Sequence, residues 1–167
     1  MKPNSLDDLY QSYVQDIYRY LRSLCHDHHV AEDLMQETFY RAYLYLENCR
    51  EDTIKPWLFR VAYNAFVDYK RKESRSVTKE AGYFNELAHP DTTEGTLLRQ
   101  ERLEEMALSV DSLPEGQRHA LLLYDFHGMS YKEAAEIMDV GMSQYKILLF
   151  RARQRLREAE RRRSRHE

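Results

Sequence analysis

The feature that most restricts the fold of this chain is a pattern in its last quarter, from Ser130 to Arg157. A short helix with a start signal, a tight turn and a longer basic helix follow one another there with helix-turn-helix spacing. Ser130 and Glu133 form an S-x-x-E capping box, which predicts where the first helix begins. Asp139 falls at the turn, where a left-handed backbone is expected and Asp is one of the few tolerated alternatives to Gly. The pattern predicts a cationic helix that can enter a DNA major groove.

The second helix of this motif divides into two sides. Ser143 is expected to cap it. Apolar residues at helical spacing are predicted to face inward: Tyr145, Leu148, Leu149, Ala152, Leu156 and Ala159. The candidates for DNA contact are Ser143, Gln144, Lys146, Ile147, Phe150, Arg151 and Arg155. An ordinary helical hairpin with a solvated basic end is the simpler alternative, and it is less favoured because cap, turn and apolar stripe agree.

Charge is unevenly distributed along the chain. The 167 residues carry a formal net charge of −3. Residues 146–167 contain nine basic and three acidic side chains, a net charge of +6, whereas residues 73–108 have a net charge of −4. Because affinity for phosphate depends on local cations, the C-terminal end can bind DNA. The acidic whole predicts weak DNA binding by the isolated chain and the need for a protein partner.

Helical periodicity with few Gly and Pro residues predicts an all-α fold of two small helical domains. In the first domain, residues 1–73, helices are expected at Leu6–Cys25, Val30–Leu46 and Trp57–Lys72. His26 to His29 is expected to form a polar break. The long first helical segment could itself be split, which would give four helices in this domain.

The second domain is expected at residues 97–167, after a flexible linker at residues 74–96 that is polar and lacks periodicity. Ser112 and Glu115 match a second capping box. The helix that follows them is expected to end near Gly128.

Several function classes are disfavoured by the sequence. No segment is long and apolar enough to span a membrane, and the N-terminus lacks the apolar stretch of a signal peptide. Cys25 and Cys49 are isolated, which predicts two free thiols in a reducing cytoplasm. The absence of a nucleophile–base set or a phosphate-binding loop predicts that the chain is not an enzyme and has no cofactor or small-molecule substrate. The histidines between His26 and His29 could bind a metal with Asp27, but a polar loop is favoured.

Two upstream segments narrow the interpretation. Residues 31–39 read A-E-D-L-M-Q-E-T-F, and residues 56–72 read P-W-L-F-R-V-A-Y-N-A-F-V-D-Y-K-R-K. In this order, and followed by the C-terminal motif, these segments resemble the extracytoplasmic-function (group four) sigma factors of bacterial RNA polymerase. Within that family, their sequences are most similar to the sigma-M-like members of Gram-positive bacteria. The resemblance covers nearly the whole chain apart from the linker and the extreme tail.

This resemblance implies a function and a set of partners. It implies an alternative sigma factor that binds core RNA polymerase through its β′ and β subunits and directs promoter-specific initiation. It further implies a role in a cell-envelope or other stress response, with control by a membrane-anchored anti-sigma factor. Promoter DNA would be contacted at the minus-ten and minus-thirty-five elements.

The resemblance also assigns roles to individual residues. Core polymerase would be bound by Asp33, Leu34, Gln36, Glu37 and Phe39, with Leu34 and Phe39 on the inward side of their helix. The minus-ten element would be bound by Asn48, Arg60, Asn64, Lys70 and Arg71, with Asn64 as the best candidate to read a base. The loop from Asn48 to Lys55 would hold a flipped base. Trp57 is expected in the core, and Asp68 is expected to orient Arg71.

The minus-thirty-five contacts would come from the outward residues of the last helix. Members of the family commonly carry a polar Ser and Arg where this chain has Ile147 and Leu148. One expected polar contact is therefore missing, and Ile147 could instead touch a thymine methyl group.

A rival hypothesis is a transcriptional regulator that binds DNA directly and uses its N-terminal helices for dimerisation or effector binding. It explains the C-terminal half equally well but leaves the acidic segment around Asp33 unexplained. The discriminating observation is whether the pure protein binds promoter DNA without polymerase.

Overall fold

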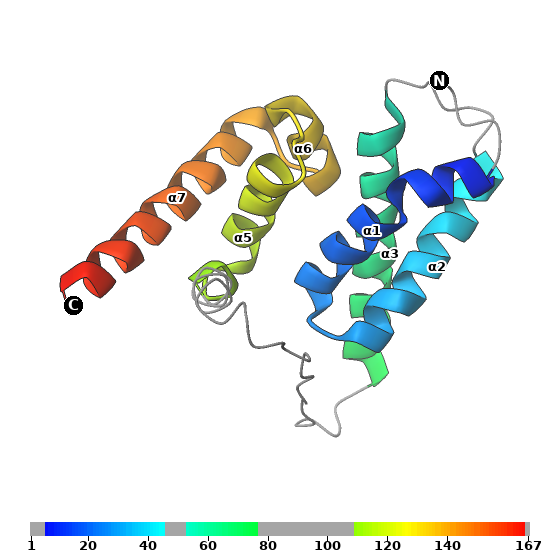
Figure 1. The fold of residues 1–167 in the computed structure, drawn as a ribbon, viewed down its shortest axis with the longest axis horizontal. Helices are drawn as coiled ribbons and strands as arrows, with labels where there is room; N and C mark the ends of the chain where they lie inside the picture. Colours follow the sequence, from blue (N-terminus) through cyan, green and yellow to red (C-terminus); the bar gives the residue numbers. More distant parts are fainter. Residues whose placement is uncertain (1–5, 46–52, 77–108, 166–167) are drawn as a thin grey trace, which may run out of the picture.

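The computed structural model describes residues 6–45, 53–76 and 109–165, all of them in helices or the short connections between helices. The described elements are α1 (Leu6–Cys25), α2 (His28–Tyr45), α3 (Ile54–Ser76), α5 (Glu115–Leu121), η4 (Leu122–Phe126), α6 (Tyr131–Met138) and α7 (Met142–Arg165). Figure 1 shows α1, α2 and α3 gathered in one group, and α5, α6 and α7 in another. The predicted all-α fold with two helical domains is confirmed.

The N-terminal domain consists of α1, α2 and α3, which pack against one another in all three pairings. Their shared core includes Leu9, Ile17, Leu21, Leu34 and Phe59. Helix α1 is continuous, so the expectation of a split in the first segment is wrong within the described residues. Its apolar stripe has a 3.6-residue period without interruption, which leaves no reason for a break.

The connection between α1 and α2 is shorter than the expected polar break. Only His26 and Asp27 lie between the helices. An Asp27 carboxylate oxygen accepts hydrogen bonds from the backbone N–H groups of His29 and Val30, at 2.8 and 3.2 Å. These are orphan donors at a helix start, so Asp27 caps α2 and allows it to begin at His28.

Helix α3 is longer than expected at both ends, since it begins at Ile54 and continues to Ser76. Pro56 therefore lies in the first turn, where its missing N–H costs nothing. Trp57 is partly buried and packs against the core, as expected. Residues 74–76 are helical rather than part of a linker, and the rest of the expected linker lies outside the described residues.

The C-terminal domain is built around α5, α6 and α7. The second capping box, at Ser112 and Glu115, is absent: Pro114 precedes α5, and no side chain caps that helix. The Ser112 hydroxyl instead donates to the carbonyl oxygen of Ser109, at 2.7 Å. A π-helical turn, η4, follows α5 directly, and Gly128 with φ of 71° ends this stretch where the sequence predicted.

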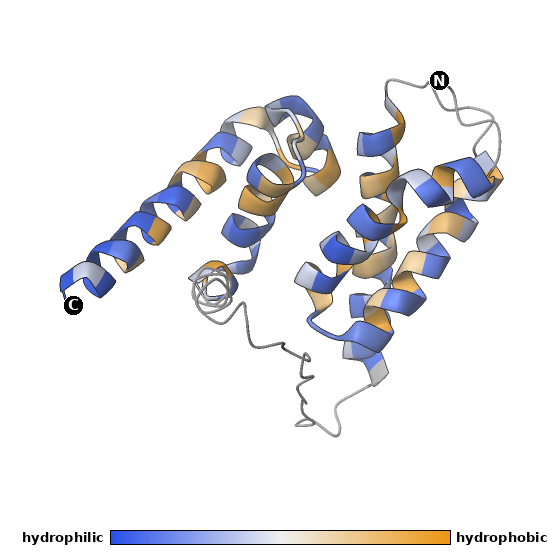
Figure 2. Ribbon diagram, in the orientation of Figure 1, coloured by the Kyte–Doolittle hydropathy of each residue, from blue (hydrophilic) through white to orange (hydrophobic). Residues whose placement is uncertain are grey.

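The two domains contact each other in this structure. Helix α3 packs against α6, and Tyr20 of α1 reaches His119 of α5. Figure 2 shows hydrophobic residues on the inner sides of the helices and a mostly hydrophilic C-terminal half of α7. None of the described helices combines the length and the hydropathy needed to cross a membrane.

Candidate nucleic-acid and protein interfaces

The start of α6 and the turn after it adopt the predicted helix-turn-helix geometry. The Ser130 hydroxyl accepts from the Glu133 backbone N–H at 3.1 Å, and a Glu133 carboxylate oxygen accepts from the Ser130 backbone N–H at 2.9 Å. Asp139 ends α6 with φ of 58° and ψ of 48°, the expected left-handed conformation. These two local signals are confirmed.

Helix α7 begins two residues earlier than a cap at Ser143 would place it. Its first residue is Met142, and the backbone N–H of Tyr145 donates to the Gly141 carbonyl at 2.9 Å. Ser143 therefore lies inside the first turn and is not the N-cap residue. Gly141 takes that place, because Gly is also accepted at N-cap positions.

Tyr145 anchors the start of α7. Its ring is fully buried, and its hydroxyl donates to the Ala120 carbonyl of α5 at 2.7 Å. Burial raises the pKa of Tyr145 far above that of a free phenol, so the hydroxyl stays a proton donor. Leu149 and Ala152 continue the buried side one and two turns later. This anchoring fixes the rotation of α7 and hence the side that it presents to solvent.

The outward side of α7 carries the predicted DNA-contact residues. All seven are exposed: Ser143, Gln144, Lys146, Ile147, Phe150, Arg151 and Arg155. Ile147 and Phe150 are 49% and 61% exposed, which is unusual for large apolar side chains in a packed domain. The Lys146 ammonium lies 5.6 Å from the centre of the Tyr131 ring, which holds this cation at the edge of the face.

A second tertiary contact between α7 and the rest of its domain was not predicted from the sequence. Arg153 donates to Asp125 of η4 at 2.8 Å, and its guanidinium lies 5.2 Å from the centre of the Tyr124 ring. The pair joins residues 28 positions apart. No local pattern in the sequence signals such a contact, and it removes Arg153 from the set of cations free to bind phosphate.

The exposed side of α3 carries four of the five residues expected at the minus-ten element. Arg60, Asn64, Lys70 and Arg71 are all exposed, and Asn48 lies outside the described residues. The Lys70 ammonium lies 5.7 Å from the centre of the Phe66 ring. In the loop proposed as a base pocket, Ile54 is buried at the start of α3 and so belongs to the core.

Asp68 has a different partner from the one expected. Its carboxylate accepts from Arg41 of α2 at 3.0 Å, and the same guanidinium donates to Glu37 at 3.0 Å. The expectation that Asp68 orients Arg71 is replaced by a bridge from α2 to α3. Arg41 thus links the acidic face of α2 to the helix that carries Asn64.

The outward face of α2 exposes the polar part of the predicted polymerase site. Asp33, Gln36 and Glu37 are exposed, whereas Leu34 and Phe39 are buried, at 6% and 4% exposed. Leu34 and Phe39 hold the helix in place and offer little surface to a partner. The structure adds large apolar side chains at the end of the same helix: Tyr40, Tyr43, Leu44 and Tyr45 are between 55% and 62% exposed.

These exposed aromatics are functional candidates that the sequence analysis did not single out. All four lie outside the apolar stripe that packs α2 against the core. Tyr is enriched at the energetic centres of protein interfaces, and an exposed apolar patch beside charged groups is typical of a docking surface. The sequence signal that could have identified these residues is their helical spacing, which places them outside the buried stripe of α2.

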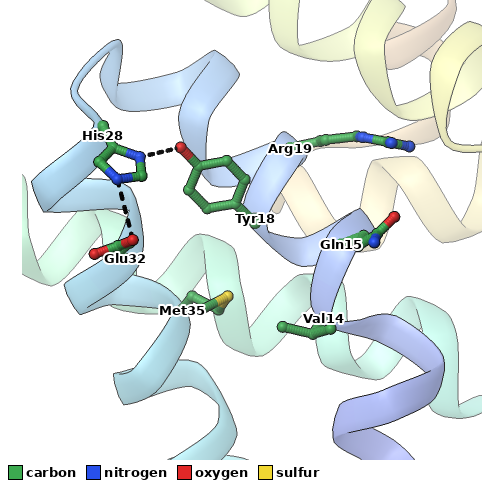
Figure 3. A pocket seen from close by; sticks show the side chains of 7 residues that line it. All are labelled: Val14, Gln15, Tyr18, Arg19, His28, Glu32 and Met35. Atoms are coloured by element: carbon green, nitrogen blue, oxygen red, sulfur yellow. Dashed lines mark hydrogen bonds and ion pairs between the residues drawn. The ribbon is translucent and has the colours of Figure 1, made fainter.

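A surface pocket of about 460 Å³ lies between α1 and α2, lined by Val14, Gln15, Tyr18, Arg19, His28, Glu32 and Met35. Figure 3 shows His28 between Tyr18 and Glu32. Its Nε2–H donates to Glu32 at 3.1 Å, and its Nδ1 accepts from the Tyr18 hydroxyl at 2.5 Å. Both ring nitrogens are thus engaged. Among the described residues, no group of three or more His, Cys, Asp or Glu side chains could hold a metal ion.

Together these features define a class of protein: an all-helical protein with a helix-turn-helix domain and a second domain that exposes an acidic helix face. Comparison with protein families gives a match to sigma-70 region 2 over residues 9–76 and to sigma-70 region 4 over residues 103–156. The ECF RNA polymerase sigma factor SigM of Bacillus subtilis (strain 168) is 41% identical over 153 residues, which cover 92% of this chain and 93% of SigM. The RNA polymerase sigma factor YlaC of the same strain is 31% identical and covers 92% of this chain and 91% of YlaC.

Solved structures similar to this chain include two complexes that agree with the two-domain helical fold. The sigma factor RpoE of Bartonella quintana, in complex with the anti-sigma factor NepR, has a TM-score of 0.74 at 28% identity and covers 90% of this chain and 95% of RpoE. CnrH, in complex with the cytosolic domain of CnrY, has a TM-score of 0.63 at 21% identity over 92% of this chain and 86% of CnrH, which supports the fold.

The chain belongs to the extracytoplasmic-function sigma factors of the sigma-70 family. It is a transcription initiation factor and not an enzyme. The similarity to SigM agrees with the sigma-M-like resemblance seen in the sequence.

Proposed function

We propose that this chain binds core RNA polymerase through the exposed face of α2 and carries the enzyme to two-element promoters in the cytoplasm. The observation that carries the proposal is the division of polar surfaces between the two domains. Helix α2 presents Asp33, Gln36 and Glu37, and helix α7 presents cations and amides. One face suits a basic protein surface and the other suits DNA phosphate.

The docking face combines charge with apolar anchors. Carboxylates at Asp33 and Glu37 would set the register on a basic partner, because complementary charge governs association rate and orientation more than affinity. Tyr40 and Tyr43 would supply the apolar contact that charge alone does not. The partner of this chemistry is the β′ subunit of core polymerase, with further contact to β.

The DNA contacts follow from the exposed faces of α3 and α7. Arg60, Lys70 and Arg71 would neutralise phosphates near the minus-ten element, and Asn64 would read a base edge. On α7, Gln144, Lys146 and Arg151 would enter the major groove at the minus-thirty-five element. Ile147 replaces a polar contact and would touch a thymine methyl group.

Regulation by an anti-sigma factor is part of the same proposal. The solved relatives RpoE and CnrH are each in a complex, RpoE with an anti-sigma factor and CnrH with the cytosolic domain of CnrY. An anti-sigma factor anchored in the membrane would hold this chain inactive until a cell-envelope or similar stress releases it.

The test is run-off transcription with bacterial core polymerase, with and without the full chain. Asp33→Arg combined with Gln36→Arg should abolish co-elution with core polymerase and reduce transcript to background, because it puts cations against a basic partner. This pair leaves the Glu37–Arg41–Asp68 bridge in place. Asp7→Arg, on the exposed start of α1, is the matched charge control and should keep full activity. Unchanged co-elution of the Asp33/Gln36 variant would refute the docking face, and promoter binding without polymerase would favour the direct regulator instead.

A further inference from the structure

Five aromatic rings meet where the two domains touch. We call them the histidine–aromatic cluster: Tyr20 of α1, Phe59 and Tyr63 of α3, His119 of α5, and His127, which follows η4. The Tyr20 hydroxyl and His119 Nε2 are 2.5 Å apart, although the two residues are 99 positions apart in sequence. The His119 ring lies 4.6 Å from Tyr63, and the His127 ring lies 4.9 Å from Phe59, measured between ring centres. The cluster has no part in the proposed contacts with polymerase or DNA.

The opposite domain buries His119 and partly covers His127. His119 is 3% exposed, and its ring partners Tyr20 and Tyr63 belong to α1 and α3. His127 packs against Tyr20 and Phe59 of the same two helices. Separating the domains would therefore return both imidazoles to water.

The charged groups around the cluster do not favour a protonated imidazole. Arg118, on the same helix, and His127 act on His119, and no carboxylate is among the groups that shift it. His127 faces Asp16 and Arg19 of α1 and Lys55 of α3, two cations against one carboxylate. Burial, with Arg118 second, lowers the pKa of His119 to about 3, and burial lowers the pKa of His127 to about 4.

Contact between the domains also limits how far apart their DNA faces can lie. Tyr63 adjoins Asn64, and its ring contacts that of His119. The next residue, Ala120, accepts the hydrogen bond of Tyr145, which adjoins Gln144. Adding side-chain lengths to these contacts places the Cα atoms of Asn64 and Gln144 at most about 35 Å apart, with about 3.8 Å for each step along the chain. Promoter elements separated by about 17 base pairs lie roughly 58 Å apart, at about 3.4 Å per step.

We propose that the histidine–aromatic cluster is a latch that holds the two domains closed in the free protein, opens for promoter engagement, and is released by acidification. The need to open rests on the proposed function, because it assumes that α3 and α7 contact the two elements at once. The response to acid does not depend on the proposed function, because it follows from the packing of the cluster.

The sign of the pH effect follows from the pKa shifts. In the open form the imidazoles return to an ordinary pKa of about 6.5, whereas in the closed form they stay neutral to about pH 4. The stability of the closed form relative to the open form is therefore greatest above about pH 6.5 and decreases as the pH falls below that value. From pH 7.5 to 5.5, the closed-to-open ratio should fall roughly tenfold for one histidine and roughly 100-fold for both. Most carboxylates stay ionised in this window.

The experiment is energy transfer between two dyes on the full chain, at Lys72→Cys and Arg157→Cys, in a background in which Cys25 and Cys49 are replaced by Ser. Both labelled positions are exposed, one on α3 and the other on α7. Transfer should drop between pH 7.5 and 5.5 in the otherwise unchanged chain. His119→Phe with His127→Phe keeps aromatic rings in the cluster and removes its two titrating groups, so its transfer should change much less than that of the unchanged chain. His29→Gln, an exposed histidine outside the cluster, should respond like the unchanged chain.

Folding of each variant is checked by circular dichroism. If the double variant does not fold, the single variant His127→Phe decides: its response should shrink from roughly 100-fold to roughly tenfold. A pH response that is absent in the unchanged chain, or identical in the histidine variants, would overturn the latch.

A final arm adds core polymerase and promoter DNA at pH 7.5, and transfer should then fall to the open value. If transcript is made while transfer keeps its closed value, opening is not required, and the inference fails while the proposed function stands. If no transcript is made, the proposed function fails, and the pH response still tests the latch.

Discussion

At the scale of single residues, the helix-turn-helix depends on backbone conformations that few side chains accept. Asp139 holds a left-handed backbone at the end of α6, with φ of 58°. Its backbone N–H donates to the Glu136 carbonyl at 3.2 Å, so the turn also satisfies a helix-end acceptor. The turn sets the path from α6 to α7.

Asp139→Ala should lower the free energy of unfolding by about 1–2 kcal/mol, because Ala has no local polar contact to offset the left-handed strain. Asp139→Gly should be close to neutral, since Gly adopts this conformation without steric cost. Urea unfolding of both variants measures the difference. Asp111→Ala, at an exposed position with an ordinary backbone, is the control. Equal stabilities for the Ala and Gly variants would show that the left-handed turn carries no strain.

At the scale of elements, two sets of tertiary contacts fix the rotation of α7 about its own axis. Tyr145 ties its start to α5, and Arg153 ties its middle to Asp125 and Tyr124. With these residues held, Arg151 and Arg155 are left on the solvent side. The helix can thus present a rigid polar face, which a groove-reading helix requires.

Arg151→Ala should weaken binding of the polymerase complex to promoter DNA. If Arg151 contacts a phosphate, the slope of log K against log salt should become about 0.9 less steep for every promoter. If it contacts a base, the slope should change little and about 1–3 kcal/mol of discrimination at one position should be lost. Filter binding at several salt concentrations separates the two cases. Arg161→Ala, further along α7, is the matched control, and equal effects of both changes would argue against a specific role for Arg151.

At the scale of the whole molecule, the spacing between the domains limits which promoters can be used. Residues 77–96 of the expected linker would reach at most about 70 Å if fully extended, at about 3.3–3.6 Å per residue. This exceeds the roughly 58 Å between promoter elements about 17 base pairs apart. The chain therefore has length to spare, but not much.

Deleting ten residues from this segment would cut its greatest reach to about 35 Å. We expect transcription from two-element promoters to be lost, while the helix content seen by circular dichroism stays unchanged apart from the deleted residues. Replacing the same ten residues with a Gly/Ser sequence keeps the length and should keep activity. Initiation by the shortened protein at a two-element promoter would contradict the spacer role.

Features that depend on neighbouring residues along the chain could be predicted from the sequence. The capping box at Ser130, the left-handed Asp139 and the outward side of α7 follow from periods and pairs within a few residues, which local physics controls. The same reasoning failed where two local options compete closely. Gly141, and not Ser143, caps α7. The Ser112 hydroxyl donates to the Ser109 carbonyl instead of forming a capping box with Glu115.

Contacts between residues far apart in sequence depend on the tertiary packing of the helices. Arg41 joins Asp68 over 27 positions, Arg153 joins Asp125 over 28, and Tyr20 joins His119 over 99. Such pairs leave no periodic trace, because their geometry depends on how whole helices cross. For the same reason the sequence indicated two domains but not that His119 and His127 lie between them. The ordinary-looking His119 owes its depressed pKa to rings from the other domain, and that packing exists only in the folded chain.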